Sequence, residues 1–172
     1  EKGYTSDIGI RGQLSDKVSF DASVFGLYYN DKIGDYLAQS LLRVRDNVGT
    51  ALTYGFEAMI DWNLSKTFFA ENEQFAWNMF TNSAVTSSEY LESDRANIKG
   101  NAVEFVPLLN FKTGTSIGYK NFMSSIQFTY VTSQFTDADN STLEKSDNTN
   151  GISGKIPAYY VADFSASYKW NR

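Results

Sequence analysis

The sequence contains no cysteine and no histidine among its 172 residues. The lack of cysteine excludes disulfide bonds and thiol catalysis. The lack of both residue types removes the commonest zinc ligands and the usual general base. We find no phosphate-binding loop, no glycine-rich nucleotide turn and no nucleophile elbow. The sequence therefore argues against an enzyme and predicts neither a cofactor nor a metal centre.

Long hydrophobic runs are also missing. No uncharged apolar stretch approaches the roughly 20 residues that a membrane-spanning helix requires, and the mean hydropathy is −0.36. The net charge of −5 argues against a nucleic-acid partner, because such partners usually bind a basic face. Aromatic residues, in contrast, are abundant at 16% of the chain. Neither a helical membrane protein nor a nucleic-acid-binding protein is expected.

The dominant hydrophobic period is two, which is typical of β-strands. Clusters of Gly, Asn, Asp and Ser separate the alternating segments. The pattern predicts a single segment of about seven strands, with no linker and no second domain. The expected strands cover residues 4–13, 18–31, 50–63, 75–87, 107–119, 122–136 and 158–170.

The two faces of these strands differ in kind. In the third strand one face reads Leu52, Tyr54, Phe56, Ala58, Ile60 and Trp62, and the other reads Thr53, Gly55, Glu57, Met59 and Asp61. Charged residues lie only on the polar faces of the strands. Contact with lipid explains this asymmetry, since a Lys or Arg on the lipid side of a barrel costs about 2–4 kcal/mol at the bilayer midplane. The sequence therefore predicts an all-β, transmembrane, antiparallel up-and-down β-barrel.

The polar face would line the barrel lumen. Five charged residues are expected there, either contacting a plug or hydrating the lumen wall: Glu57, Asp61, Lys112, Asp163 and Lys169. Aromatic residues fall near both ends of the strands, as two membrane-interface girdles would require. One girdle would hold Trp62, Trp77, Tyr119, Phe122, Tyr168 and Trp170, and the other Tyr28, Tyr54, Tyr130 and Tyr160.

Connection lengths alternate along the chain. Those at 14–17, 64–74 and 120–121 are short or moderate, whereas those at 32–49, 88–106 and 137–157 are long and polar. Outer-membrane barrels have short periplasmic turns and longer extracellular loops, so strands one and seven should both run towards the periplasm. An odd strand count cannot close such a barrel. We therefore expect a segment of a larger barrel, without its closing strands.

Three segments resemble the C-terminal barrel half of TonB-dependent outer-membrane receptors. They are Tyr54-Gly55-Phe56-Glu57, then Gly100-Asn101 through Val103 to Pro107, then Ile156-Pro157-Ala158-Tyr159-Tyr160-Val161-Ala162-Asp163 with Tyr168. The sequence pattern of these segments is most similar to that of iron-complex receptors of the ferric-citrate or siderophore type found in Bacteroidetes. The resemblance implies a barrel of about 22 strands filled by a plug. It also implies residence in the bacterial outer membrane, amid phospholipid and lipopolysaccharide.

The resemblance further implies active uptake of a ferric chelate at the extracellular mouth. Energy would come from the TonB complex, which acts through an N-terminal part and a plug domain absent from this sequence. Cobalamin and glycans are other ligands of the family. Arginine suits an anionic chelate, because its guanidinium donates bidentate hydrogen bonds to carboxylates. The candidate ligand contacts in the long loops are Tyr36, Arg43, Arg45, Tyr90 and Arg95.

Alternatives remain open at this point. The carboxylates between Asp137 and Asn148 could hold Ca²⁺, although their spacing matches no EF-hand and a solvated loop is the simpler interpretation. A small self-contained barrel of about eight strands, porin-like or structural, would need no energised transport. A soluble lipid-binding barrel would require the apolar residues to face inward.

Overall fold

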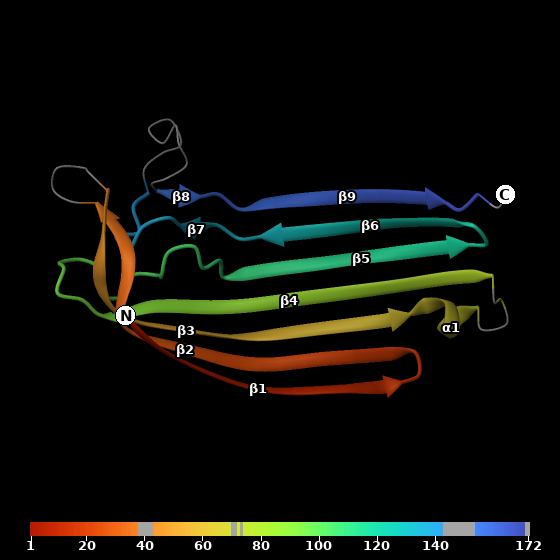
Figure 1. Cartoon of the computed structure of the whole chain (residues 1–172), viewed down its shortest axis with the longest axis horizontal. Coiled ribbons are helices and arrows are strands. Elements are labelled where there is room, and N and C mark those ends of the chain that lie inside the picture. Colours follow the sequence, from red (N-terminus) through yellow and green to blue (C-terminus); the bar gives the residue numbers. More distant parts are fainter. Residues whose placement is uncertain (38–42, 70–71, 73, 143–153, 171–172) are drawn as a thin grey trace.

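The computed structural model describes residues 1–37, 43–69, 72, 74–142 and 154–170. These residues form a seven-stranded antiparallel sheet in which the strands follow one another in sequence order (Figure 1). The strands are β1 (Lys2–Ser15), β2 (Val18–Leu37), β3 (Arg43–Asn63), β4 (Phe75–Glu92), β5 (Leu109–Tyr119), β6 (Phe122–Val131) and β9 (Tyr159–Tyr168). The prediction of about seven up-and-down strands is confirmed.

Three minor elements complete the fold. Helix α1 (Leu64–Phe68) lies between β3 and β4. Strands β7 (Gln134–Phe135) and β8 (Lys155–Ile156) pair with each other between β6 and β9. We call the end of the sheet with connections 16–17, 64–74 and 120–121 the turn end, and the opposite end the loop end. Among the described residues, no helix is long and apolar enough to cross a bilayer.

Strand register gathers the apolar residues on one face. Phe56 stands opposite Val24 in β2 and opposite Val85 in β4, and Val85 in turn stands opposite Leu109 in β5. The same rule places Glu57 opposite Ser23, on the other face. Because side chains alternate between faces along a strand, the register gathers most of the apolar residues on one face, although Phe25 and Phe80 lie among the polar rows. The predicted division into an apolar and a polar face is therefore present.

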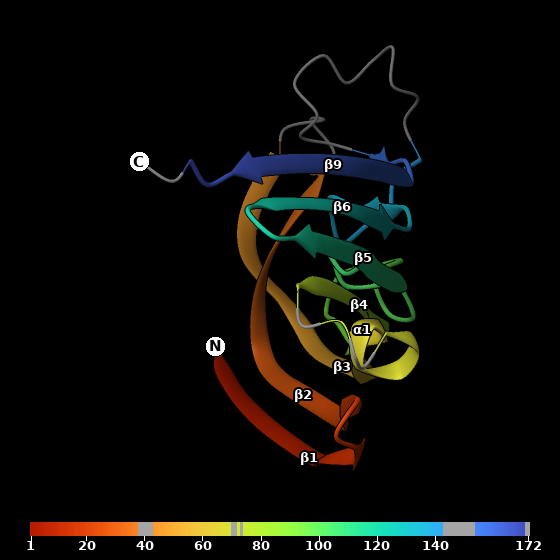
Figure 2. The ribbon, with the colours of Figure 1, turned by 90° about the vertical axis from the view of Figure 1, so that its right-hand side faces the viewer.

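The sheet is curved, and the polar face is its concave side. Figure 2 shows the arc end-on, with the tips of β2 and β3 lying over its concave side. Two hollows lie against this concave face, and their linings include the polar-face residues Arg11, Asp21, Glu57, Ser116 and Gln127. Most of the large apolar side chains lie on the convex face instead, with Phe25 and Phe80 as exceptions. This is the reverse of what a soluble lipid-binding barrel requires.

The long loop expected at 32–49 is instead an extension of the β2–β3 hairpin. Pairing resumes after register shifts beside Lys32 and runs on to Leu37 opposite Arg43. Asp31 and Gly49 adopt positive φ at this break, as irregular strand positions often require. Beyond the apolar belt the hairpin mixes polar residues with Ile33, Tyr36, Val44 and Val48 in irregular order, so no period-two signal marks it. Strand β4 likewise continues to Glu92, and the segment expected at 122–136 breaks after Val131 into β6 and β7.

The hydrophobic core lies at the loop end rather than between two layers of strands. We call residues 32–36, 44–51, 90–108 and 132–142 the loop layer. Its buried cluster consists of Val48, Ala51, Tyr90, Ile98, Val103 and Ala138, with Tyr36 and Val106 packed against it. Ala51 and Tyr90 project from the concave face, where they are register partners. The loop layer is therefore packed over the concave side of the sheet at one end.

Candidate functional site

Backbone and amide hydrogen bonds tie three segments of the loop layer together. The Ala138 N–H donates to the Asp35 carbonyl of the β2–β3 hairpin at 2.8 Å. The Asn101 side chain donates to the Ala138 carbonyl at 2.8 Å. The Asn140 side chain makes two 2.8 Å bonds with Ala102, one to its N–H and one to its carbonyl. The loop layer thus presents a fixed surface, because its segments satisfy one another's polar groups.

Asp137 organises a turn in the third segment. Its side chain is buried and accepts hydrogen bonds from the Ser141 hydroxyl at 2.6 Å, the Ser141 N–H at 3.0 Å and the Gly154 N–H at 3.2 Å. These donors occupy the carboxylate oxygens that a calcium ion would use. Among the described residues no acidic cluster is suited to a metal ion. Asp147 and Asn148 lie outside the described residues.

A buried polar group joins the hairpin, β4 and the loop that follows. The Tyr90 hydroxyl donates to Glu104 Oε2 at 2.7 Å, and Lys32 Nζ lies 3.9 Å from Glu104 Oε1. Burial, together with the hydrogen bond to Glu104, raises the pKa of Tyr90 well above its ordinary value. Tyr90 is fully buried, so the structure places it in the core and not on a ligand-facing surface.

Arg95 and Tyr36, two candidate ligand contacts, touch each other. The Arg95 guanidinium lies 3.6 Å from the centroid of the Tyr36 ring, which is cation–π geometry. Its Nη2 donates to Asp46 Oδ2 at 2.8 Å. The Nε of Arg95 is buried and has no hydrogen-bond partner among the described residues. One face of the planar guanidinium and its Nη2 are therefore engaged within the protein.

Arg45 differs from Arg95 because its side chain faces solvent, with 77% exposed, and it lies 3.9 Å from Asp35 Oδ1. Arg45 borders a hollow of about 700 Å³ at the loop end, together with Glu1, Lys32, Ile33, Asp46 and Asn47. Arg43 begins β3, but its side chain lies outside what the structure describes. Arg45 is thus more exposed than the candidates Tyr90 and Arg95.

Sequence reasoning did not single out Lys32, Asp46 or Glu104, all of which bind other members of the loop layer. Each is a polar residue in a stretch without periodicity, so no sequence signal distinguished it. Their partners are far away along the chain, and only the folded layer brings them together.

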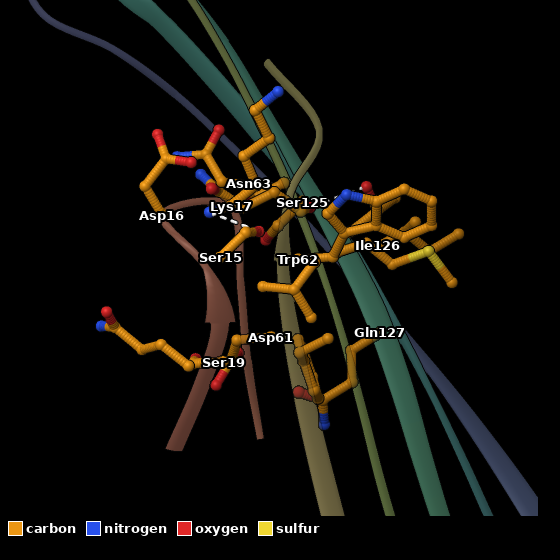
Figure 3. Close-up of a pocket in the computed structure, with 17 residues that line it drawn as sticks. Ser15, Asp16, Lys17, Ser19, Asp61, Trp62, Asn63, Ser125, Ile126 and Gln127 are labelled. Atoms are coloured by element: carbon orange, nitrogen blue, oxygen red, sulfur yellow. Dashed lines mark hydrogen bonds between the residues drawn. The ribbon is translucent and has the colours of Figure 1, made fainter. Parts of the chain in front are cut away.

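The concave wall holds the predicted lumen-facing charges. Glu57, Asp61, Lys112 and Asp163 follow the polar register rows, and Lys169 continues the same alternation after β9. Glu57 borders a hollow of about 630 Å³ beside the Arg11–Asp21 ion pair, whose atoms lie 2.6 Å apart. Asp61 borders another of about 440 Å³ near the turn end (Figure 3). Contact of these residues with a plug stays a prediction.

A curved antiparallel sheet with an apolar convex face, a charged concave face and loops folded over one end is a segment of a transmembrane β-barrel wall. The family model described as "TonB dependent receptor-like, beta-barrel" matches residues 1–172. The chain therefore belongs to the TonB-dependent receptor β-barrel family. Comparison with curated proteins gives no match.

Solved structures show the same fold. The unliganded ferric citrate transporter FecA aligns with a TM-score of 0.78 and 19% identity, covering 100% of this chain and 24% of that one. The ferric yersiniabactin uptake receptor FyuA from Yersinia pestis aligns with a TM-score of 0.65 and 20% identity over 96% of this chain and 22% of that one. The copper transporter OprC aligns with a TM-score of 0.68 and 16% identity over 99% of this chain and 23% of that one. The chain thus spans about a quarter of the length of these structures.

Proposed function

We propose that this chain forms part of the wall and mouth of an outer-membrane active transporter that takes up a ferric chelate. The observation that carries the proposal is the loop layer, a packed surface over the concave side of a barrel segment with an exposed arginine at its edge. Similar structures include the ferric citrate transporter FecA and the ferric yersiniabactin uptake receptor FyuA. Ferric citrate is the specific ligand we propose, ahead of other siderophores, cobalamin and glycans.

We further propose that the chain works as one segment of a larger barrel. Within the described residues β1 and β9 each pair on one side only, and the sheet does not close. Unpaired strand edges cannot face lipid, because their backbone groups would lack hydrogen-bond partners. Further strands would pair with these two edges, and a plug domain coupled to TonB would fill the lumen. A small self-contained barrel is disfavoured for the same reason.

Arg45 is the residue we propose as an anion contact. A ferric chelate with carboxylate groups carries negative charge, and a guanidinium can donate two parallel hydrogen bonds to one carboxylate. The side chain can do so, since its contact with Asp35 is long at 3.9 Å and most of the arginine side chain faces solvent. Arg43, two residues earlier on the same strand, stays a predicted contact. Tyr36 and Arg95 would support this surface rather than touch the chelate.

The test is binding of ferric citrate to the whole receptor, measured by calorimetry for the wild type, Arg45→Ala and Lys99→Ala. Loss of one charge-assisted contact should weaken binding by about 10- to 100-fold for Arg45→Ala, which corresponds to about 1.5–3 kcal/mol. Lys99 is an exposed cation of the same loop layer, so Lys99→Ala controls for the change in net charge. Unchanged affinity in Arg45→Ala would remove the residue from the site. Failure of every ferric chelate to bind the wild type would refute the proposed function.

A further inference from the structure

Helix α1 occupies the longest connection at the turn end and is firmly capped. The Asn63 side chain accepts hydrogen bonds from the Lys66 N–H and the Ser65 hydroxyl, both at 2.8 Å, as a helix N-cap does. The Thr67 hydroxyl donates to the Asn63 carbonyl and accepts from the Trp62 indole N–H, both at 2.9 Å. The helix is therefore fixed against the last residues of β3.

Two phenylalanines at the end of this helix are exposed. The Phe68 side chain is 62% exposed and that of Phe69 is 44% exposed. The Phe68 ring lies 6.3 Å from the Trp62 ring, between centroids. The Phe69 ring lies 5.0 Å from the Phe75 ring in edge-to-face geometry and 6.4 Å from the Trp77 ring. Each phenylalanine thus rests on aromatic residues of the sheet while its outer surface stays uncovered.

The aromatic residues beneath them belong to the convex face. Trp62 is in register with Val18 and Met79, and Phe75 and Trp77 are in register with Tyr119 and Ile117. These positions continue the apolar rows that face outward along the whole sheet. Phe68 and Phe69 therefore extend the outward-facing apolar surface past the ends of β3 and β4. The two-residue turns at 16–17 and 120–121 add no apolar side chain of this kind.

We propose that α1 is a membrane-interface foot, in which Phe68 and Phe69 insert among the phospholipids of the leaflet at the turn end. Phospholipid is the expected occupant because the exposed surface is continuous with the face that contacts lipid along the strands. Aromatic rings are favoured at the boundary between headgroups and acyl chains. The proposal depends on membrane insertion of the barrel and not on the identity of the transported ligand.

The polar side of the connection is consistent with this placement. Lys66 is exposed, and its Nζ donates to the Asp16 carbonyl of the neighbouring turn at 3.4 Å. Glu71 and Glu73 follow in the same connection, but they lie outside the described residues. With both signs of charge present, insertion should depend on apolar contact and hardly on the charge of the lipid headgroup.

Nitroxide labels can measure the depth of this foot in the whole receptor. The 172-residue sequence has no cysteine, so Phe68→Cys and Phe105→Cys each add one labelling site within it. Phe105 is a matched control, because it is a similarly exposed phenylalanine (53%) in the loop layer at the opposite end. In phosphatidylcholine vesicles, a label at 68 should collide with oxygen and be shielded from a water-soluble nickel chelate. The label at 105 should show the reverse preference.

Equal access of the nickel chelate to both labels would overturn the proposal. Shielding of the label at 68 that appears only at high protein-to-lipid ratio would also overturn it, since a second copy would then cover the surface. Equal shielding in vesicles with and without anionic lipid supports apolar insertion. Ferric-chelate binding by the labelled receptors reports separately on folding and on the proposed function. A receptor that binds its chelate with residue 68 exposed to water would contradict only the membrane-interface foot.

Discussion

The guanidinium of Arg95 lies 3.6 Å from the centroid of the Tyr36 ring. This contact joins the β2–β3 hairpin to the segment after β4, two parts of the chain that are distant in sequence. The ion pair between Arg95 and Asp46 reinforces it at 2.8 Å. Residues that resemble separate ligand contacts in the sequence thus act on each other in the structure, and the loop layer derives part of its rigidity from them.

Replacement of Tyr36 should loosen the loop layer. Tyr36→Leu removes the ring under the guanidinium and should cost about 0.5–2 kcal/mol of local stability, the usual range of a cation–π contact. Hydrogen exchange of the backbone amides in 90–103 should accelerate accordingly. Tyr36→Phe is the matched control, because it retains the aromatic ring and should exchange as the wild type does. Equal acceleration in both variants would show that the hydroxyl, and not the ring, holds Arg95.

Gly34 is placed where only a residue without a side chain fits. A Cβ at this position would lie 2.6 Å from Glu104 Oε1 and 2.9 Å from both the Tyr90 hydroxyl and Val48 Cγ2. Gly34→Ala should therefore displace the buried Glu104–Tyr90 pair and destabilise the loop layer by about 1–3 kcal/mol, as overpacking does. We would measure this by resistance of the loop layer to limited proteolysis.

Gly26 provides the control for that substitution, since it lies in the same strand and a Cβ there would meet no atom within 4 Å. Gly26→Ala should leave proteolytic resistance unchanged. If Gly26→Ala and Gly34→Ala behaved alike, the cost would come from the strand backbone and not from crowding around Glu104.

The strands and their faces could be predicted from the sequence because lipid contact imposes a strict alternation on residues such as Phe56 and Glu57. The loop layer could not be predicted, because its core unites Val48, Tyr90 and Ala138 from three segments with no common period. The extension of the β2–β3 hairpin could not be predicted for the same reason, since beyond the membrane both of its faces tolerate polar residues. Candidate ligand residues chosen by type alone therefore included Tyr90, which the fold buries.

Burial of Tyr90 has a consequence at alkaline pH. The pKa of Tyr90 is raised, chiefly by burial and then by the hydrogen bond to Glu104. A tyrosine in the unfolded chain ionises at about pH 10. The unfolded loop layer would therefore lose this proton before the folded one, and its stability should fall as the pH rises above about 10. Absorbance titration should count the same number of ionising tyrosines in the wild type and in Tyr90→Phe over this range. One fewer in the variant would show that Tyr90 is accessible to solvent.

The assignment of the two faces can be tested with one substitution on each, at adjacent positions of β3. Phe56 lies on the convex face near the middle of the strand, and Glu57 lies on the concave face. Phe56→Arg places a charge against lipid and should cost about 2–4 kcal/mol at the bilayer midplane. Glu57→Arg places the same side chain in the lumen, where water solvates it, and should be tolerated. The amount of folded receptor assembled in the outer membrane would then be low for Phe56→Arg and near wild type for Glu57→Arg. The opposite order would require the convex face to line the lumen, which the curvature of the sheet contradicts.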